Sequence, residues 1–161
     1  MAICTVPEAL EQVLSAVHPL PARKESLSTA LGCVLARDLV ASSSLPGWDN
    51  SAVDGFAVRA ADVTSAAENN PIHLRVIAEV PAGKPATVRL EPQTCARIFT
   101  GAPIPEGADA VVMIEHIKRD ARTITLDRAV KAGDHIVPRG REARAGALLV
   151  PAKTCMGYAE M

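Results

Sequence analysis

Residues 45–59, L-P-G-W-D-N-S-A-V-D-G-F-A-V-R, crowd polar side chains at a point where a turn should meet a strand. The pair Asp54-Gly55 predicts a tight bend before the apolar run 56–58. A loop of this kind can hold carboxylates near a cation. An Asx-type turn that only connects two elements would show the same spacing, so both interpretations stay open. The other side chains able to hydrogen-bond the nearby backbone are Asp49, Asn50 and Ser51.

Two further loops carry groups suited to binding anions. In residues 100–112, T-G-A-P-I-P-E-G-A-D-A-V-V, Thr100 and Gly101 can present a hydroxyl and backbone amides at a strand end. In residues 138–146, P-R-G-R-E-A-R-A-G, Arg139 and Glu142 lie in a glycine-flanked bend, and the planar donors of arginine suit phosphate or carboxylate oxygens. A rigid hairpin connection and a solvated charged turn would look the same.

Composition and charge exclude several classes of function. The 17 basic and 18 acidic residues nearly balance and are scattered, which argues against non-specific binding of nucleic acid. The four aromatic residues, one Trp, one Tyr and two Phe, are too few for the stacking platforms of single-strand binders. Neither the four cysteines nor the four histidines have metal-ligand spacing, so no zinc or redox motif is indicated. No signal peptide and no run of about 18 apolar residues occurs, so we expect a cytoplasmic protein that does not bind membranes.

Apolar periodicity predicts the elements that must position these loops. The capping-box spacing of Thr5 and Glu8, with helical spacing of the apolar residues that follow, predicts an amphipathic helix ending before Pro19. A shorter helix is expected over 28–35, and the alternation over 72–80 predicts a half-buried strand. Turn signals about every ten residues favour a curled antiparallel sheet or small barrel, so the predicted class is mainly β with an N-terminal helix (α+β). Further strands are expected at 87–90, 96–99, 110–117, 123–126 and 147–150.

Three segments, taken together, closely resemble the N-terminal region of the MoeA family. They are D-N-S-A-V-D-G-F-A-V-R (49–59), T-G-A-P-I-P-E-G-A-D-A-V-V (100–112) and R-G-R-E-A-R-A-G (139–146). Members of this family are molybdopterin molybdenumtransferases related to the gephyrin E domain. The resemblance implies the last step of molybdenum cofactor biosynthesis, in which molybdate is inserted into the dithiolene of adenylylated molybdopterin and AMP is released. It also implies Mg²⁺ as cofactor and a homodimer.

The resemblance assigns roles to residues of the three motifs. Asp54 is expected to be an essential acid of the cleft, with Thr100 and Glu142 as further catalytic residues. Because Mg²⁺ prefers oxygen ligands, Asp54 and Glu142 are the candidate metal ligands. Arg139 and Glu142 would face the pterin phosphate or its metal. The residues expected to contact substrate are Asn50, Ser51, Gly101 and Arg139.

The third motif departs from the family pattern, in which an arginine-rich approach leads into R-G-E-D. Val137 and Pro138 stand where arginines are usual, and Arg141-Glu142 stands in place of Glu-Asp. Two cations are lost and the acid at position 142 is one methylene longer. We therefore expect an altered geometry at this corner.

The resemblance predicts two subdomains, with residues 45–137 as a β-rich insertion between flanking segments 1–44 and 138–161. In the family an α/β molybdopterin-binding domain and a C-terminal β domain follow, and this chain contains neither. The family's cleft lies at a dimer interface and needs the α/β domain, so this chain alone should lack turnover.

Two other functions stay open. A non-catalytic dimerisation or scaffold module, as a truncated or degenerate homologue, would also fit the shortened chain and the altered third motif. A hydrolase pair drawn from Asp49, Asp54, Asp109 and Glu115 has little support, because nothing in the sequence fixes the distances between these acids.

Overall fold

The computed structural model describes residues 4–161 and divides into two compact units. One unit is 40–149, and the other contains the chain up to Leu39 together with Val150–Met161. The sequence analysis placed these divisions at 44/45 and 137/138. In the structure, backbone hydrogen bonds from Ala41 N–H to the Ala147 carbonyl (2.9 Å) and from Leu45 N–H to the Ala143 carbonyl (2.7 Å) join residues 41–45 to residues 143–147. This pairing keeps both segments in the larger unit.

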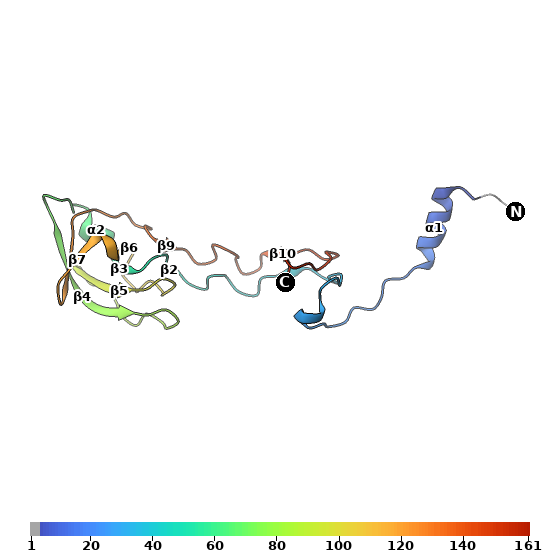
Figure 1. Cartoon of the computed structure of the whole chain (residues 1–161), viewed down its shortest axis with the longest axis horizontal. Helices are drawn as coiled ribbons and strands as arrows, with labels where there is room; N and C mark the ends of the chain where they lie inside the picture. The colour runs from blue at the N-terminus through green and yellow to red at the C-terminus, as the bar shows by residue number, and fades with distance from the viewer. Residues whose placement is uncertain (1–3) are drawn as a thin grey trace. The chain divides into compact units, whose positions relative to one another are not determined.

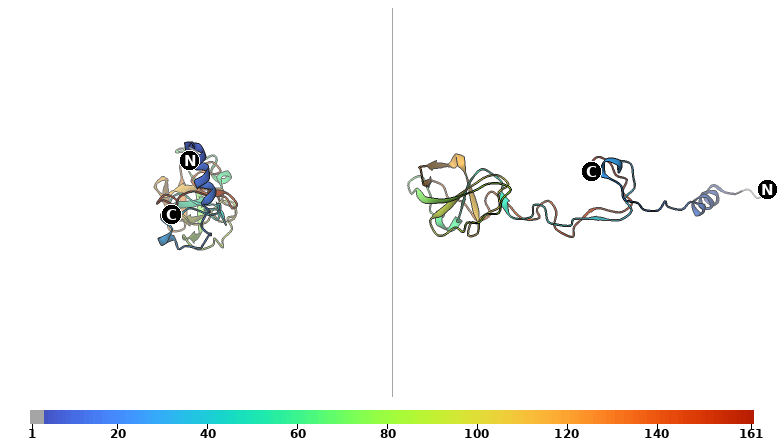
Figure 2. Two further views of the ribbon diagram at one scale, coloured as in Figure 1. Left: turned by 90° about the vertical axis from the view of Figure 1, so that its right-hand side faces the viewer. Right: turned by 90° about the horizontal axis from the view of Figure 1, so that it is seen from below.

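The larger unit is built on a six-stranded sheet with strand order β6-β3-β5-β4-β8-β7. Its strands are β3 (Gly55–Val58), β4 (Ile72–Val80), β5 (Thr94–Ile98), β6 (Ala110–Met113), β7 (Ile117–Arg119) and β8 (Thr123–Leu126). Figure 1 labels β3, β4, β5, β6 and β7 of this sheet. Two short ladders pair β2 (Asn50–Ser51) with β9 (Ile136–Val137), and β1 (Leu39–Val40) with β10 (Leu148–Val150). The strands curl around one another, as Figure 2 shows, and the predicted mainly-β class is confirmed.

One strand pair differs from the predicted antiparallel pattern. β4 and β5 run parallel, with a register shift between Val76 and Ala78, whereas every other neighbouring pair in this sheet is antiparallel. Parallel pairing requires the chain to return to the start of β4 before β5 begins, which the connection 81–93 does. As a result β5 lies between β3 and β4, and its last residues reach the start of β3.

The core lies on both faces of β3. Phe56 and Val58 belong to one buried cluster with Leu74, while Ala57 belongs to a second with Ile98. Because successive side chains of a strand point to opposite faces, a strand covered on both sides must be apolar throughout. The run F-A-V of β3 meets this requirement, and all four residues of the strand are buried.

The N-terminal helix α1 (Val6–Ala16) confirms the prediction from Thr5 and Glu8. The Glu8 carboxylate accepts hydrogen bonds from the Thr5 backbone N–H and hydroxyl, both at 2.8 Å. None of the residues of α1 is buried, and its apolar stripe at Leu10, Val13 and Leu14 is more than half exposed. No helix within residues 4–161 is long and apolar enough to cross a membrane.

Three expected elements differ in the structure. The helix predicted over 28–35 is wrong: a single 3-10 turn, η1 (Leu27–Thr29), is followed by Gly32 at φ +78°. Backbone pairing replaces it, since Gly32 N–H donates to the Met156 carbonyl (2.8 Å) and Leu35 N–H to the Thr154 carbonyl (2.9 Å). Contacts distant in sequence thus override a weak local helix preference.

The strand predicted at 87–90 is also wrong, because this segment forms only an isolated bridge between Arg89 and Glu106. The strand predicted over 110–117 is split, since the 3-10 turn η2 (Ile114–His116) separates β6 from β7. A short helix, α2 (Ala60–Val63), was not predicted. The strands at 72–80 and 123–126 have the predicted bounds.

Candidate functional site

Asp54 and Thr100 meet at one edge of the sheet. Asp54 directly precedes β3 and Thr100 follows β5, and the antiparallel register Gly55↔Ile98 brings these two strand ends together. Both residues are exposed. The Asp54 Oδ1 atom accepts a hydrogen bond from the Thr100 backbone N–H (2.8 Å) and another from the Thr100 hydroxyl (2.7 Å). The carboxylate is therefore fixed in position while remaining accessible to solvent.

These contacts favour the charged form of Asp54. The Thr100 backbone N–H and then the Thr100 hydroxyl hold the pKa of Asp54 below its ordinary value. Desolvation opposes them, and the positive charge of Arg97 lowers the pKa by a smaller amount than either hydrogen bond. The Arg97 guanidinium lies 5.0 Å from the Phe99 ring centroid and 5.9 Å from that of Phe56, which are cation–π distances. The sequence analysis missed Arg97, because one arginine in a strand carries no motif.

The turn after Thr100 is held by backbone contacts to β2. Gly101, at φ +80°, donates its N–H to the Ser51 carbonyl (2.8 Å), and Ser51 N–H donates to the Ala102 carbonyl (2.9 Å). The buried Ser51 hydroxyl donates to the Val53 carbonyl (2.6 Å) and accepts from the Val53 N–H (3.3 Å). Ser51 thus uses its side chain inside its own turn, where it supports the bend that leads to Asp54.

All three motifs converge on the residues before that bend. Asn50 lies between two partners, Val137 of β9 and Pro103 of the second motif. The Asp49 backbone carbonyl accepts from Ile104 N–H (3.0 Å), and its Oδ1 atom accepts from Arg139 N–H (2.7 Å). Asp49 therefore ties the first motif to the other two. The sequence analysis considered Asp49 only as a turn residue and in the poorly supported hydrolase pair, because its local Asx-type pattern was the only available signal.

The third motif folds back on the start of the first. Gly140 N–H donates to the Pro46 carbonyl (2.9 Å) and Glu142 N–H to the Leu45 carbonyl (3.0 Å). The side chains of Arg139 and Glu142 are exposed. Within residues 4–161, neither side chain has a hydrogen bond or ion pair to Asp54. The structure thus joins Asp54 to Thr100 directly, and joins Arg139 to them only through Asp49 and β2.

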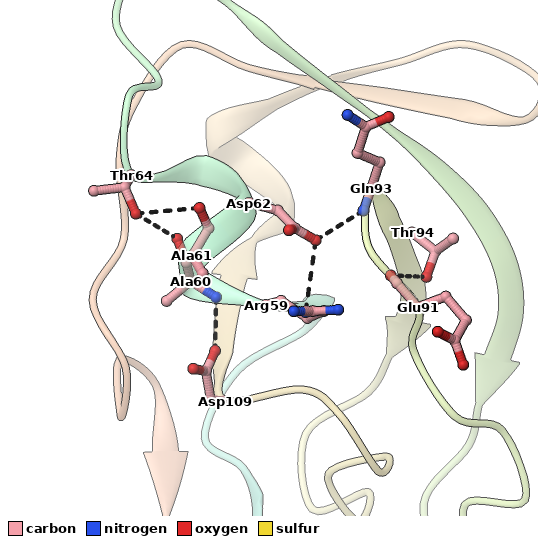
Figure 3. A network of polar contacts seen from close by, with 9 residues as sticks. All are labelled: Arg59, Ala60, Ala61, Asp62, Thr64, Glu91, Gln93, Thr94 and Asp109. Carbon is pink, nitrogen blue, oxygen red and sulfur yellow. Dashed lines mark hydrogen bonds and ion pairs between the residues drawn. The ribbon is translucent and has the colours of Figure 1, made fainter.

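Asp109 belongs to a different network, shown in Figure 3. Its Oδ1 atom accepts the Ala60 N–H at the start of α2 (2.6 Å), while Asp62 accepts the Gln93 N–H (2.8 Å). Within the described part of the chain, no group of three or more His, Cys, Asp or Glu residues could hold a metal ion. Asp109 therefore orders α2, and within residues 4–161 its carboxylate has no hydrogen bond or ion pair to Asp54.

The chain matches known proteins along almost its whole length. The profile of the MoeA N-terminal region (domain I and II) covers residues 4–161. The chain is 42% identical over 120 residues to molybdopterin molybdenumtransferase 2 of Mycobacterium tuberculosis (strain ATCC 25618 / H37Rv), covering 74% of this chain and 30% of the relative. It is 38% identical over 146 residues to the molybdopterin molybdenumtransferase of Synechococcus elongatus (strain ATCC 33912 / PCC 7942 / FACHB-805), covering 88% of this chain and 36% of that one.

Solved structures agree with this assignment. A crystal structure of the molybdopterin biosynthesis moeA protein from Pyrococcus horikoshii OT3 superposes with a TM-score of 0.88 at 36% identity, covering 99% of this chain and 42% of that one. A second structure of the moeA protein from the same species gives a TM-score of 0.91 at 31% identity and covers 99% of this chain and 41% of that one. The chain thus spans about a third of the length of the two curated relatives described above. The chain belongs to the MoeA family and corresponds to the N-terminal region of its members.

Proposed function

We propose that this chain is the N-terminal part of a molybdopterin molybdenumtransferase, which inserts molybdate into adenylylated molybdopterin in molybdenum cofactor biosynthesis. Family membership and the relatives' names support the reaction class. The observation that carries the assignment of a site is the accessible Asp54 carboxylate, held by two hydrogen bonds from Thr100.

The geometry of this pair suggests separate roles for its two residues. The lowered pKa of Asp54 favours its charged form, which suits the carboxylate to binding a cation better than to accepting a proton from a substrate group. Both hydrogen bonds from Thr100 use Oδ1, and no hydrogen bond or ion pair within residues 4–161 uses Oδ2. Thr100 would therefore orient the carboxylate, and Oδ2 would face the substrate.

The residues of this site could supply only part of the ligands of Mg²⁺, and substrate and water would supply the rest. Mg²⁺ in proteins usually takes one or two carboxylates together with substrate phosphates and water, and Asp54 can supply one such oxygen. Glu142, the second candidate, is exposed and has no contact to Asp54 in the described residues. When bound, Mg²⁺ would neutralise negative charge on the substrate phosphates. Arg139, whose backbone N–H is held by Asp49, would add positive charge from the third motif.

The proposed site is one side of a cleft. Transfer between two anionic reactants requires both to be held in position and shielded from water, and one exposed carboxylate on an open turn cannot do this alone. We therefore propose that the rest of the protein supplies the other wall, in a cytoplasmic homodimer, and that the 161-residue chain has no turnover by itself.

A reconstituted assay tests the role of Asp54. The chain would be combined with a separately expressed portion carrying the remaining domains, and insertion of molybdate into adenylylated molybdopterin followed through released AMP. Asp54→Asn should lower the rate by roughly a hundredfold or more. Asp127→Asn, at an exposed acid directly after β8, is the matched control. Equal rates for Asp54→Asn and the wild type would show that Asp54 has no such role.

The alternative is a non-catalytic dimerisation or scaffold module. The exposed stripe on α1 favours it, because a helix with no buried residue gains stability once its apolar face is covered. Light scattering of the chain should then show a dimer that the double variant Leu10→Glu/Leu14→Glu converts to a monomer. A clean wild-type monomer at micromolar concentration would contradict both this alternative and dimerisation through α1.

A further inference from the structure

A pocket of about 280 Å³ lies beside the second motif. Its wall consists of Trp48, the turn residues 83–86, and Pro103 and Ile104. Lys84 is the only charged residue of this wall. Trp48, the sole tryptophan of the chain, is 53% exposed although its indole is a large apolar surface. An exposed indole in the wall of a mostly apolar pocket has the character of a ligand-binding surface.

Backbone contacts fix this pocket relative to the Asp54 site. Asp49, the residue after Trp48, accepts the Ile104 N–H (3.0 Å), and Pro103 is bridged to Asn50. The turn 100–104 therefore contributes to the pocket at one end and to the contact with Asp54 at the other. A substrate lying along this short turn could reach both.

We propose that this pocket binds a planar heteroaromatic ring that carries an anionic group. The Trp48 indole would stack on the ring, as aromatic side chains stack on nucleic-acid bases. The Lys84 ammonium, which has no ion pair within residues 4–161, would attract the anionic group. The pocket is smaller than the ~300–1,000 Å³ of sites that enclose a drug-sized ligand, so it would hold one ring system and not a whole adenylylated pterin.

This inference rests on the proposed function, since it assigns a ring subsite to the same substrate. That substrate has two parts of this chemistry, the pterin and the adenylyl group. The shared chemistry identifies the pocket, and separate probes distinguish the two parts.

Binding to the 161-residue chain tests the inference without any need for turnover. The probes are AMP and 6-carboxypterin, with adenosine and unsubstituted pterin as their uncharged controls and ribose 5-phosphate as a control without a ring. Binding would be measured by calorimetry, and for AMP also by the emission of Trp48. AMP or 6-carboxypterin should bind more tightly than its uncharged control, and ribose 5-phosphate should bind weakly. The tighter of the two charged probes identifies the part of the substrate that the pocket takes.

Variants then locate the binding. Trp48→Leu should weaken the preferred probe roughly tenfold, and Trp48→Phe should restore most of the affinity because a ring can still stack. Lys84→Gln should weaken it about two- to fivefold, as expected for an exposed ion pair, and remove the preference over the uncharged control. Lys131→Gln, at an exposed lysine outside the pocket wall, is the matched control and should bind like the wild type.

Several outcomes would overturn the inference. These are no binding of either ring probe, equal affinities of Trp48→Leu and the wild type, or a preference for proline-rich peptides over both rings. Any of these combined with a strong effect of Asp54→Asn in the reconstituted assay would leave the proposed function intact. Conversely, ring binding that depends on Trp48 without any effect of Asp54→Asn would support the pocket and contradict the proposed role of the acid.

Discussion

Replacing Gly55 with alanine should destabilise the larger unit strongly, although the change adds only one methyl group. Gly55 opens β3, the strand that lies between β5 and β6. A Cβ atom at this position would lie 1.9 Å from the Val112 carbonyl oxygen and 2.9 Å from its carbonyl carbon. The adjacent residue is Asp54, so this close approach of β6 also sets the position of the candidate site.

The size of the effect follows from what would have to move. Ordinary van der Waals contact begins near 3.4 Å, so the Val112 carbonyl would have to retreat by about 1.5 Å. This carbonyl belongs to backbone in the β3–β6 ladder, where Phe56 pairs with Val112, and not to a flexible side chain. Overpacking of this kind costs about 2–4 kcal/mol at a buried position. With roughly 3–5 °C per kcal/mol for a unit of this size, Tm should fall by about 10 °C.

Thermal and urea unfolding followed by circular dichroism would measure this loss. Gly47→Ala is the matched control, because the nearest atom to a Cβ there is the Ser44 carbonyl oxygen at 3.9 Å. Its stability should stay within about 0.5 kcal/mol of the wild type. A Gly55→Ala protein that unfolds together with the wild type and with Gly47→Ala would refute the close packing of β3 against β6.

Three further predictions concern single side chains. Thr100→Val removes one of the hydrogen bonds that lower the pKa of Asp54, so an NMR titration of the carboxyl carbon should show this pKa rising yet staying below its ordinary value, because the backbone N–H remains. Because the pKa of Asp54 is lower in the folded state, its contacts with Thr100 stabilise the fold fully above the ordinary pKa of the carboxyl. This stabilisation is lost as the pH falls through the folded-state pKa. If stability fell with acid pH in the same way in Thr100→Val and the wild type, this reasoning would be contradicted. Asp109→Ala removes the acceptor at the start of α2 and should cost about 1 kcal/mol in urea unfolding, whereas Asp109→Asn keeps an oxygen and should cost less. Burial raises the pKa of the Cys95 thiol to about 12. Alkylation near neutral pH should therefore modify exposed Cys155 and spare Cys95 until the protein unfolds. Equal alkylation rates of the two thiols in the folded protein would disprove the burial of Cys95.

The sequence by itself determined the elements whose signals are local. The capping box of Thr5 and Glu8 fixed the start of α1, and strict alternation fixed β4 at Ile72–Val80. Each signal lies within the element that it specifies, so no distant contact is needed to interpret it. The polar loops could be located for the same reason, because turn residues act on their own backbone.

The tertiary structure decided which of these loops meet. Thr100 reaches Asp54 across 46 positions, and Arg139 reaches Asp49 across 90, through a register that no local pattern encodes. Distant contacts also decided the structure of residues 28–35, since backbone pairing with 154–156 replaced the helix that the local pattern favoured. Local propensities amount to about 1 kcal/mol per residue or less, so a set of distant hydrogen bonds and buried contacts can override them. The polar residues of the candidate site could therefore be identified from the sequence, whereas their arrangement in space was determined only by the tertiary structure.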